Sequence, residues 1–321
     1  MSHVSSFNTE ITPKALAYVT KDALKIGLIE RIQRLHVKKI PLGETPRRIA
    51  YQEETHLFGI LTTKIVSPEE EQSFFKILDD QTFESKNVFA HADMIVLDEF
   101  SMEKYEVVQS LVSVPGNENQ RPAFVVGTAF VVPTEEEPSK GRLLVFEVND
   151  FKRIELLQQM DVSGCVYSIS AFEGDKIVAG INAKVHLYQW SFAEGHLRIL
   201  TSLCAHHGYI VALNLAVYGN FIVVGDLMKS VSVLTYNSED MKLVESYRDY
   251  ATNWMTAVEA FDQDHFIGAD NHFNLFTLHK HMQGDIDDQQ LVEDGQFHVG
   301  EMINRFRHGA FEKIYRRCSW I

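Results

Sequence analysis

The hydrophobic positions of this chain fall into short runs whose spacing is typical of β-strands. Within residues 219–254, residues 221–225 form an apolar run rich in β-branched side chains, and residues 231–236 alternate between apolar and polar. A turn-like stretch at 227–230 separates the two runs, and another short alternating run follows at 242–247. Because such runs and such alternation are typical of buried and half-buried strands, the pattern predicts strands joined by tight connections.

The same unit recurs at a regular interval, which can be counted on the glycine that ends each second strand. The runs AFVVG, KIVAG, FIVVG and HFIG end at Gly127, Gly180, Gly225 and Gly268, at intervals of 53, 45 and 43 residues. An earlier member, Gly59, lies 68 residues before Gly127. A four-stranded β-propeller blade occupies about 40 to 50 residues. Since one such sheet cannot bury both of its faces alone, we predict an all-β fold, a β-propeller.

The blades can be placed along the chain, and we expect about six. The predicted strands or strand pairs lie at 15–29, 32–41, 47–53, 56–65, 107–114, 122–132, 141–148, 153–159, 167–172, 176–180, 184–190, 196–203, 209–218, 221–225, 231–236, 242–247 and 255–278. An insertion at 66–105, with strand-like runs at 74–78 and 94–97, explains the long first interval.

The two ends of the repeat region set the predicted domain boundaries. We expect the propeller domain to occupy residues 1–309. A further blade should continue after residues 295–300, but the chain that follows supplies no strand pair. The predicted ring is therefore incomplete at its C-terminus, and residues 310–321 form a divergent short tail.

Composition indicates a globular protein large enough for one repeat domain. The chain has 321 residues, of which 45% are hydrophobic and 23% charged. No apolar run approaches the roughly 20 residues that cross a bilayer, and the first ten residues do not resemble a signal peptide, so we expect no membrane partner. Three widely spaced cysteines, Cys165, Cys204 and Cys318, suit a reducing compartment. We expect a location in the nucleus and cytoplasm.

The net charge argues against broad attraction to nucleic acid. The formal charge is −14 at pH 7, from 30 Lys and Arg against 44 Asp and Glu. Non-specific affinity for phosphate backbones is carried mainly by Lys and Arg. Direct binding of nucleic acid is therefore expected to be weak or absent unless a local basic patch exists.

The sequence contains no recognisable motif for catalysis, metal binding or cofactor binding. Cys204, His206 and His207, and separately His279 and His281, are possible ligands, but neither group has a second ligand pair at zinc-finger spacing. The acidic run at 285–288 lacks the glycine and terminal glutamate of a calcium loop. Phosphate-binding, nucleophile-elbow and zinc-protease signatures do not occur. We expect no enzyme, no cofactor and no metal.

Several long runs carry a resemblance to a known family. They are ALKIGLIERIQRLHVKKIPLGETPRRIAYQEE, FVVGTAFVVPTEEEPSKGRLLVFEV, FIVVGDLMKSV and NWMTAVEAFDQDHFIGADNHFNLF. In order and interval they resemble the third propeller of the damage-specific DNA-binding protein family, a branch of the cleavage and polyadenylation factor A-subunit family. The resemblance covers roughly residues 7–309.

The resemblance implies an interaction scaffold that serves as adaptor of cullin 4 RING ubiquitin ligases. Family members join three propellers: the second holds the cullin, and a cleft between the first and third receives substrate receptors, which are WD-type propellers or helical insertion segments. A third propeller alone would recruit receptors in ubiquitination and UV-damage repair but would reach cullin only indirectly, through the first and second propellers. Two alternatives stay open: a nucleic-acid-binding propeller of the damage-recognition or RNA-processing type, and a fragment with no independent role.

The repeat itself predicts where a partner would bind. In a blade with alternating strands, the segment before the first strand and the connection between the second and third lie at the same end. Unusual residues gather in these places: Tyr167, Trp254, Ala129, Glu135, Glu137, Leu227 and Lys229. Apolar side chains in turns suggest a surface for a partner, and Trp is enriched among interface residues that dominate binding.

The resemblance extends this set by matching local motifs. The positions that resemble receptor-contacting positions of the family are Ala129, Glu135, Glu137, Tyr167, Leu213, Leu227, Arg248, Trp254 and Asn304. Lys229 stands where the family has an arginine, which keeps the charge but loses the bidentate fork. Val211, Asn214, Met302 and Arg305 also depart from the family pattern.

Each of these residues also has an interpretation that needs no partner. Trp254 would cap a blade core, and Leu213 in an alternating strand would belong to the core. The acidic triplet at 135–137 would be a solvated loop rather than a docking site for a basic helix. Arg248 would pair locally with Asp249 or Glu245.

Overall fold

The computed structural model describes residues 3–7, 15–19, 24–28, 42–67, 70–79, 96–116, 121–192, 198–282 and 289–308. The chain divides into two compact units, one of residues 1–39 with 308–321 and one of residues 40–307. All elements in the described residues are β-strands, which confirms the predicted all-β class. The predicted strand at 32–41 and the predicted tail at 310–321 lie outside the described residues.

The first unit contains a three-stranded antiparallel sheet. Its strands are β1 (His3–Phe7), β2 (Ala15–Val19) and β3 (Leu24–Leu28), in the order β1-β2-β3. The predicted strand pair at 15–29 is present as β2 and β3, with Ala17 opposite Ile26.

The second unit contains five four-stranded antiparallel blades of a β-propeller. Three of them are separate sheets, and the last two are joined into one eight-stranded sheet by a parallel pairing of Arg248 with Gln290. The first strands are β4 (Thr45–Gln52), β8 (Glu106–Val114), β12 (Val166–Phe172), β16 (Ala212–Tyr218) and β20 (Met255–Ala260). The second strands are β5 (Leu57–Ser67), β9 (Ala123–Phe130), β13 (Lys176–Ile181), β17 (Phe221–Asp226) and β21 (His265–Asp270).

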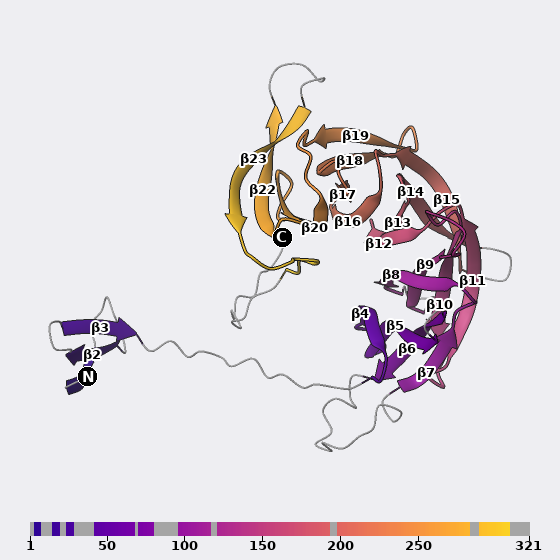
Figure 1. Ribbon diagram of the computed structural model, residues 1–321, viewed down its shortest axis with the longest axis horizontal. Helices are drawn as coiled ribbons and strands as arrows, with labels where there is room; N and C mark the ends of the chain where they lie inside the picture. The colour runs from indigo at the N-terminus through magenta and orange to yellow at the C-terminus, as the bar shows by residue number, and fades with distance from the viewer. Residues whose placement is uncertain are drawn as a thin grey trace. The chain divides into compact units, whose positions relative to one another are not determined.

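The third and fourth strands form the outer half of each blade. The third strands are β6 (Glu70–Asp79), β10 (Gly141–Val148), β14 (Lys184–Phe192), β18 (Val231–Asn237) and β22 (Asn274–Met282). The fourth strands are β7 (Val96–Ser101), β11 (Ile154–Val162), β15 (Arg198–His207), β19 (Lys242–Arg248) and β23 (Gln289–His298). Figure 1 shows the first strands near the centre of this unit and the fourth strands at its periphery.

Two sequence-based expectations about the blades differ from the structure. Five four-stranded blades are described; of the sixth expected unit, residues 15–29 form β2 and β3 of the three-stranded sheet, and residues 32–41 lie outside the described residues. Residues 289–298 are β23, the outer strand of the last blade. The region 66–105 contains β6 and β7, which pair with β5 to complete the first blade. The pairing of these two strands could not be predicted from the sequence, because a long connection separates them.

The core lies between successive blades, and both faces of the sheets contribute to it. In β9, Phe124 packs into the cluster shared with the first blade, whereas Val125 packs into the cluster shared with the third. In the same way, Ile177 faces the second blade and Val178 faces the fourth. A further cluster joins the fourth and fifth blades. Burial on both faces explains why the second strands are continuous apolar runs.

Three of the recurring glycines, Gly59, Gly127 and Gly180, lie where neighbouring blades approach closely. A Cβ added at Gly127 would lie 2.5 Å from Val166 Cγ1 of the next blade, and one added at Gly180 would lie 2.6 Å from the backbone oxygen of Ala212. Real Cβ atoms do not approach other atoms so closely, so only glycine fits. Inter-blade contact, rather than turn geometry, therefore accounts for these glycines. A Cβ at Gly268 would instead meet Phe276 and Met255 of its own blade, and one at Gly225 would make only ordinary contacts.

Substitution of these glycines tests this account. Gly180→Ala is expected to lower the free energy of unfolding by about 1–3 kcal/mol, because the backbone oxygen of Ala212 cannot move aside without displacing β16. Gly225→Ala is the matched control, since its Cβ would lie 3.4 Å from the nearest atoms, and its effect is expected to stay below about 1 kcal/mol. Urea unfolding followed by circular dichroism measures both; equal effects would contradict the close-contact explanation.

Candidate functional site

The segments that lead into the first strands and the connections between second and third strands meet at one end of the propeller. Backbone hydrogen bonds join them, both within a blade and between neighbouring blades. The bonds are Leu227 N to Val211 O (2.9 Å), Asn271 N to Trp254 O (3.0 Å), Ala212 N to Asn182 O (2.9 Å) and Ser230 N to Asn253 O (3.1 Å). We call this end the upper rim and the opposite end the lower rim.

Exposed apolar side chains are more numerous at the upper rim. Those at the upper rim are Tyr105, Val131, Tyr209, Tyr250, Trp254 and Phe273, and those at the lower rim are Phe151, Tyr218, Met241 and Phe261. Trp254 directly precedes β20, as predicted, and is 43% exposed. Tyr167 was expected before the first strand but lies within β12, half-buried. The upper rim therefore has a partly apolar surface.

Arg248 ends β19 at the upper rim, where it stacks on aromatic rings. Its guanidinium carbon lies 3.6 Å from the ring centroid of Tyr209 and 5.2 Å from that of Tyr250. The Tyr209 hydroxyl donates to the two carboxylate oxygens of Glu245 at 2.8 and 3.0 Å. Burial and this carboxylate raise the pKa of Tyr209. Asp249 accepts a hydrogen bond from Ser230 Oγ (2.5 Å). The local contact of Arg248 is thus a cation–π contact.

Asp226, at the end of β17, holds the β17–β18 turn and the start of the fourth blade together. Its Oδ2 accepts hydrogen bonds from the backbone N–H groups of Ile210 (2.9 Å) and Val211 (3.2 Å). Its Oδ1 accepts from those of Met228 (3.0 Å) and Lys229 (3.1 Å). Four donors on one buried carboxylate leave this turn little freedom, so Leu227 and Lys229 are presented half-buried in a fixed conformation.

A buried ion pair supports the loop between β9 and β10, which carries the acidic triplet. Arg142 pairs with Glu106 through both carboxylate oxygens, and one of the two contacts, Nε to Oε1, is 2.8 Å. Thr128 Oγ1 also donates to Glu106 Oε1 (2.6 Å), and Arg142 Nη1 donates to Glu103 Oε1 (2.6 Å). Burial acts to lower the pKa of Arg142, but the two glutamates outweigh it and raise that pKa. The base of the loop is therefore fixed by charge-assisted hydrogen bonds.

The acidic loop contacts the third blade. Asn182 Nδ2 donates to Pro138 O (3.3 Å), and Asn182 Oδ1 accepts from Cys165 N (2.7 Å). Glu135 accepts from Ser139 N and Oγ at 3.2 and 2.8 Å. Burial, with a smaller repulsion from Glu137, raises the pKa of Cys165 and of its hydrogen-bonded neighbour Tyr167 to about 12. The acidic loop is thus held against the third blade, which carries Tyr167 in β12.

The remaining predicted residues divide between a cavity and the core. Tyr167, Leu213 and Asn304 line one cavity near the centre of the propeller. Ala129 lies in β9 with no exposed surface, so it can shape a partner site only from within. The predicted set therefore comprises the cavity group, the acidic loop, the β17–β18 turn, and Arg248 with Trp254.

Three residues that support the upper rim were not predicted from the sequence. Asp226, Asp270 and Asn182 each follow the strand-ending glycine by one or two positions and accept backbone hydrogen bonds at the upper rim. Asp270 Oδ1 accepts from the N–H groups of His272 and Asn274, both at 2.9 Å. The sequence could have predicted these residues, because Asp or Asn recurs one or two positions after the strand-ending glycine. Side chains of Asp and Asn commonly fix turns by accepting backbone hydrogen bonds.

The described residues contain neither a candidate metal site nor a membrane-spanning helix. His279 Nδ1 lies 2.6 Å from Asp294 Oδ1, and its ring centroid lies 6.1 Å from that of His281. The part of the chain that the structure describes contains no cluster of three or more His, Cys, Asp or Glu suited to a metal ion. The same part contains no helix long and apolar enough to cross a membrane. The acidic run at 285–288 lies outside the described residues.

Removal of the Asp226 carboxylate should loosen the upper rim. Asp226→Ala leaves four backbone donors without their acceptor, and the expected loss is at least about 2 kcal/mol of unfolding free energy. Asp240→Ala, at an exposed turn between β18 and β19, serves as control and should change stability by less than about 0.5 kcal/mol. Thermal unfolding compares the two; a stable Asp226→Ala variant would show that the carboxylate is not needed.

The chain matches one family model and several curated proteins. The model described as the CPSF A subunit region matches residues 72–317. The chain is 44% identical over 314 residues to DNA damage-binding protein 1a of Arabidopsis thaliana, 42% over 316 residues to DNA damage-binding protein 1 of Solanum lycopersicum, and 41% over 315 residues to DNA damage-binding protein 1 of Oryza sativa subsp. japonica.

These matches cover nearly all of this chain but only part of the relatives. Each alignment spans 97% of the chain and 28% of the relative, so the chain spans little more than a quarter of their length. The resemblance inferred from the long sequence runs is confirmed. The chain belongs to the family of the CPSF A subunit region, and within it to the propeller region shared with DNA damage-binding proteins.

Proposed function

We propose that this propeller is a protein-interaction scaffold, not an enzyme, and that it recruits substrate receptors to a cullin 4 RING E3 ubiquitin ligase. The process would be protein ubiquitination in the repair of UV-damaged DNA, in the nucleus and cytoplasm. The names of the relatives, which are DNA damage-binding proteins, support the link to damaged DNA. The link to receptors and cullin follows the family resemblance read from the sequence.

The observation that carries the proposal is the set of aromatic side chains on a rigid upper rim. Trp254, Tyr209 and Tyr250 are 43%, 40% and 68% exposed, and hydrogen bonds fix the backbone on both sides of Trp254. Aromatic side chains that are held in place before binding lose little conformational entropy when a partner covers them. Such residues commonly dominate the energy of protein–protein interfaces.

Charges elsewhere on the upper rim favour a partner of mixed character. The loop with Glu135 and Glu137, in the second blade, is acidic and exposed, whereas Lys229 lies in the β17–β18 turn of the fourth blade. An amphipathic helical segment with a basic face, or the rim of a WD-type propeller, fits this alternation of acidic, apolar and basic positions. First and second propellers, where present, would complete the binding cleft and hold the cullin, so this chain would contact cullin only indirectly.

Nucleic-acid binding is the second candidate, and one observation favours it: the relatives are named for binding damaged DNA. The formal charge of −14 opposes it, because phosphate contacts need Lys and Arg. Direct binding would show a steep fall of affinity with rising salt. Fluorescence anisotropy with UV-irradiated and intact duplexes at low salt tests this candidate, and undetectable binding to both would exclude it.

The scaffold proposal predicts a specific loss of receptor binding. Trp254→Ala should weaken binding of a purified WD-type substrate receptor by about 30-fold, since truncation of a central aromatic anchor costs about 2 kcal/mol or more. Surface plasmon resonance with the immobilised chain measures the dissociation constant.

Phe261→Ala is the matched control for this experiment. Phe261 is an exposed aromatic residue of the β20–β21 turn on the lower rim, so its loss should leave receptor binding unchanged. The proposal is wrong if a folded Trp254→Ala variant binds as tightly as the original chain, or if both variants lose affinity equally.

A further inference from the structure

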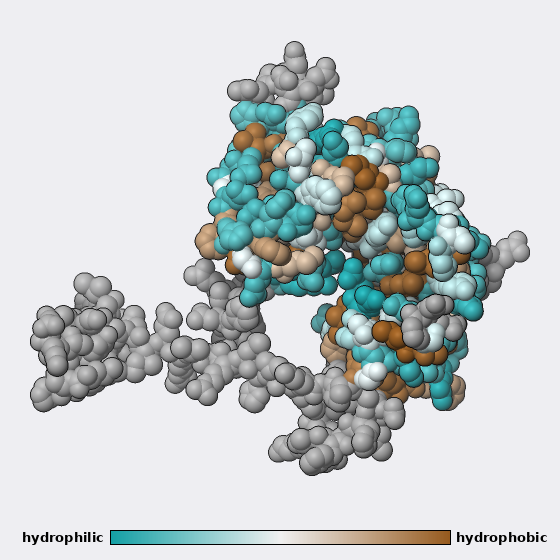
Figure 2. All heavy atoms as spheres, viewed as in Figure 1, coloured by the Kyte–Doolittle hydropathy of each residue, from teal (hydrophilic) through white to brown (hydrophobic). Residues whose placement is uncertain are grey.

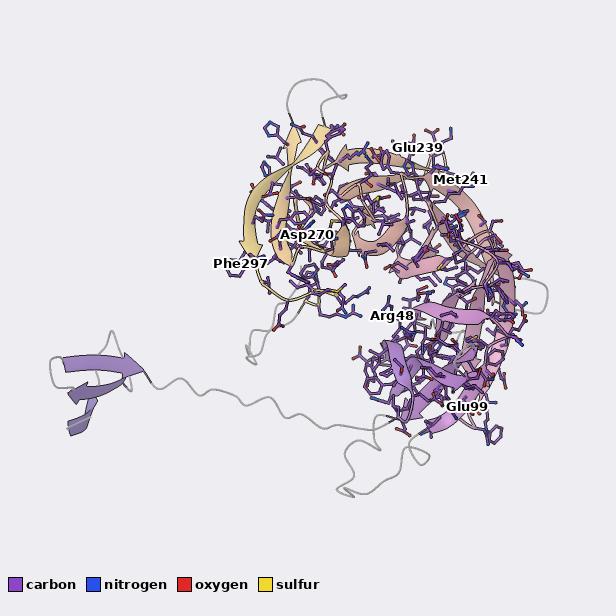
Figure 3. The ribbon with its side chains drawn as sticks, viewed as in Figure 1. Arg48, Glu99, Glu239, Met241, Asp270 and Phe297 are labelled. Atoms are coloured by element: carbon purple, nitrogen blue, oxygen red, sulfur yellow. The ribbon has the colours of Figure 1, made fainter. Side chains whose placement is uncertain are left out.

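A cavity of about 570 Å³ lies near the centre of the propeller unit. Residues of the first strands β4, β8, β12 and β16 line it, together with the segment at 304–307 that follows β23. Hydrophilic side chains border part of the central opening in Figure 2, and Arg48 lies on the inner side of the unit in Figure 3, whereas Glu99 and Phe297 lie at its periphery. The volume falls within the range of small-molecule sites.

Among the residues that the structure describes, four arginines and no acidic residue line this cavity. They come from both sides, Arg47 and Arg48 from β4 and Arg305 and Arg307 from the segment after β23. A concentration of positive charge is unexpected in a chain with a formal charge of −14. The cavity therefore differs in charge from the protein as a whole.

The arginines of β4 are only weakly neutralised. Arg47 Nη2 lies 3.9 Å from Glu71 Oε2, and its Nε donates to Thr63 Oγ1 at 3.4 Å. Arg48 Nη1 donates to the backbone oxygen of Arg47 (3.2 Å). Burial and the neighbouring charge of Arg47 lower the pKa of Arg48, although an arginine stays protonated at neutral pH.

The two arginines after β23 complete the positive cluster. The surrounding protein partly shields Arg305 from water, although its side chain is not buried, and this shielding lowers its pKa. The charges of Arg307 and Arg48 lower it further, while Glu259 acts in the opposite direction. Thr256 Oγ1 donates to Ile303 O (2.6 Å), which anchors this segment to the fifth blade. Charges of like sign are thus held close together across the cavity by the fold, and an anion between them would relieve their repulsion.

The rest of the lining is mostly apolar or already hydrogen-bonded. Ser110 Oγ donates to Val166 O (2.7 Å), and Asn214 Nδ2 donates to Thr256 O (3.1 Å). Ile49, Leu111 and Leu213 contribute apolar surface. Recognition in this cavity would therefore depend on the guanidinium groups, with an apolar wall available to an organic part of the ligand.

We propose that this central cavity binds a small, multiply charged phosphate anion, either a free polyphosphate or the polyphosphate group of a nucleotide. Guanidinium groups match phosphate oxygens in geometry and bind them through paired hydrogen bonds. Four of them on two sides of the cavity suit several phosphate groups rather than one. A cavity of this size excludes a nucleic-acid duplex. The site does not depend on receptor recruitment.

Isothermal titration calorimetry on the full chain at low salt tests the proposal, with tripolyphosphate and ATP as probes. We expect one-to-one binding that weakens as salt is raised, because the contacts are ionic. Arg305→Gln combined with Arg307→Gln should weaken the binding at least about tenfold, as expected for loss of charge-assisted hydrogen bonds. Both residues are exposed, so the variant should remain folded.

Lys184→Gln combined with Lys242→Gln is the control, since it removes the same charge from exposed sites outside the cavity. Its affinity should stay within about twofold of the original chain, because screened surface charges contribute little. Tighter binding of ATP than of tripolyphosphate would assign a nucleotide, and equal binding would assign free polyphosphate. Absence of binding by both probes, equal loss in both variants, or arginine-dependent binding of duplex DNA alone would overturn the proposal.

Discussion

Close contact between neighbouring sheets is the constraint on which the rest of this structure depends. Each second strand is apolar on both faces, so a blade needs neighbouring blades to bury it. Gly127 and Gly180 allow the next blade to approach to a distance that leaves no room for a side chain. The same contact sets the position of the first strands around the centre, and with them the cavity and the upper rim.

The upper rim is rigid because side-chain acceptors, and not only backbone pairing, hold its turns. Asp226 and Asp270 each accept several backbone hydrogen bonds, and the ion pair of Arg142 with Glu106 fixes the base of the acidic loop. Turns fixed in this way present Trp254 and its aromatic neighbours without the entropy cost of an ordering loop. The upper rim consists of connections between strands, but because these are rigid it can serve as a binding surface.

The arginines of this protein lie in two different electrostatic environments. Arg142 is neutralised by two glutamates in the second blade, which satisfies a buried cation. The described residues that line the cavity include no acidic partner for Arg48 or Arg305. The contrast separates an arginine that stabilises the fold from arginines that are available to a ligand.

Sequence alone determined the strands, the blade repeat and the family, because alternation and spacing are local properties of the chain. It also placed Trp254 and the turn with Leu227 at one end of the blades. It missed Asp226 as the residue that organises this end, and it gave no sign that Arg48 and Arg305 face one cavity. Those facts depend on contacts between positions that the sequence separates, up to 257 residues apart for the two arginines, and only the packing of blade on blade brings such positions together.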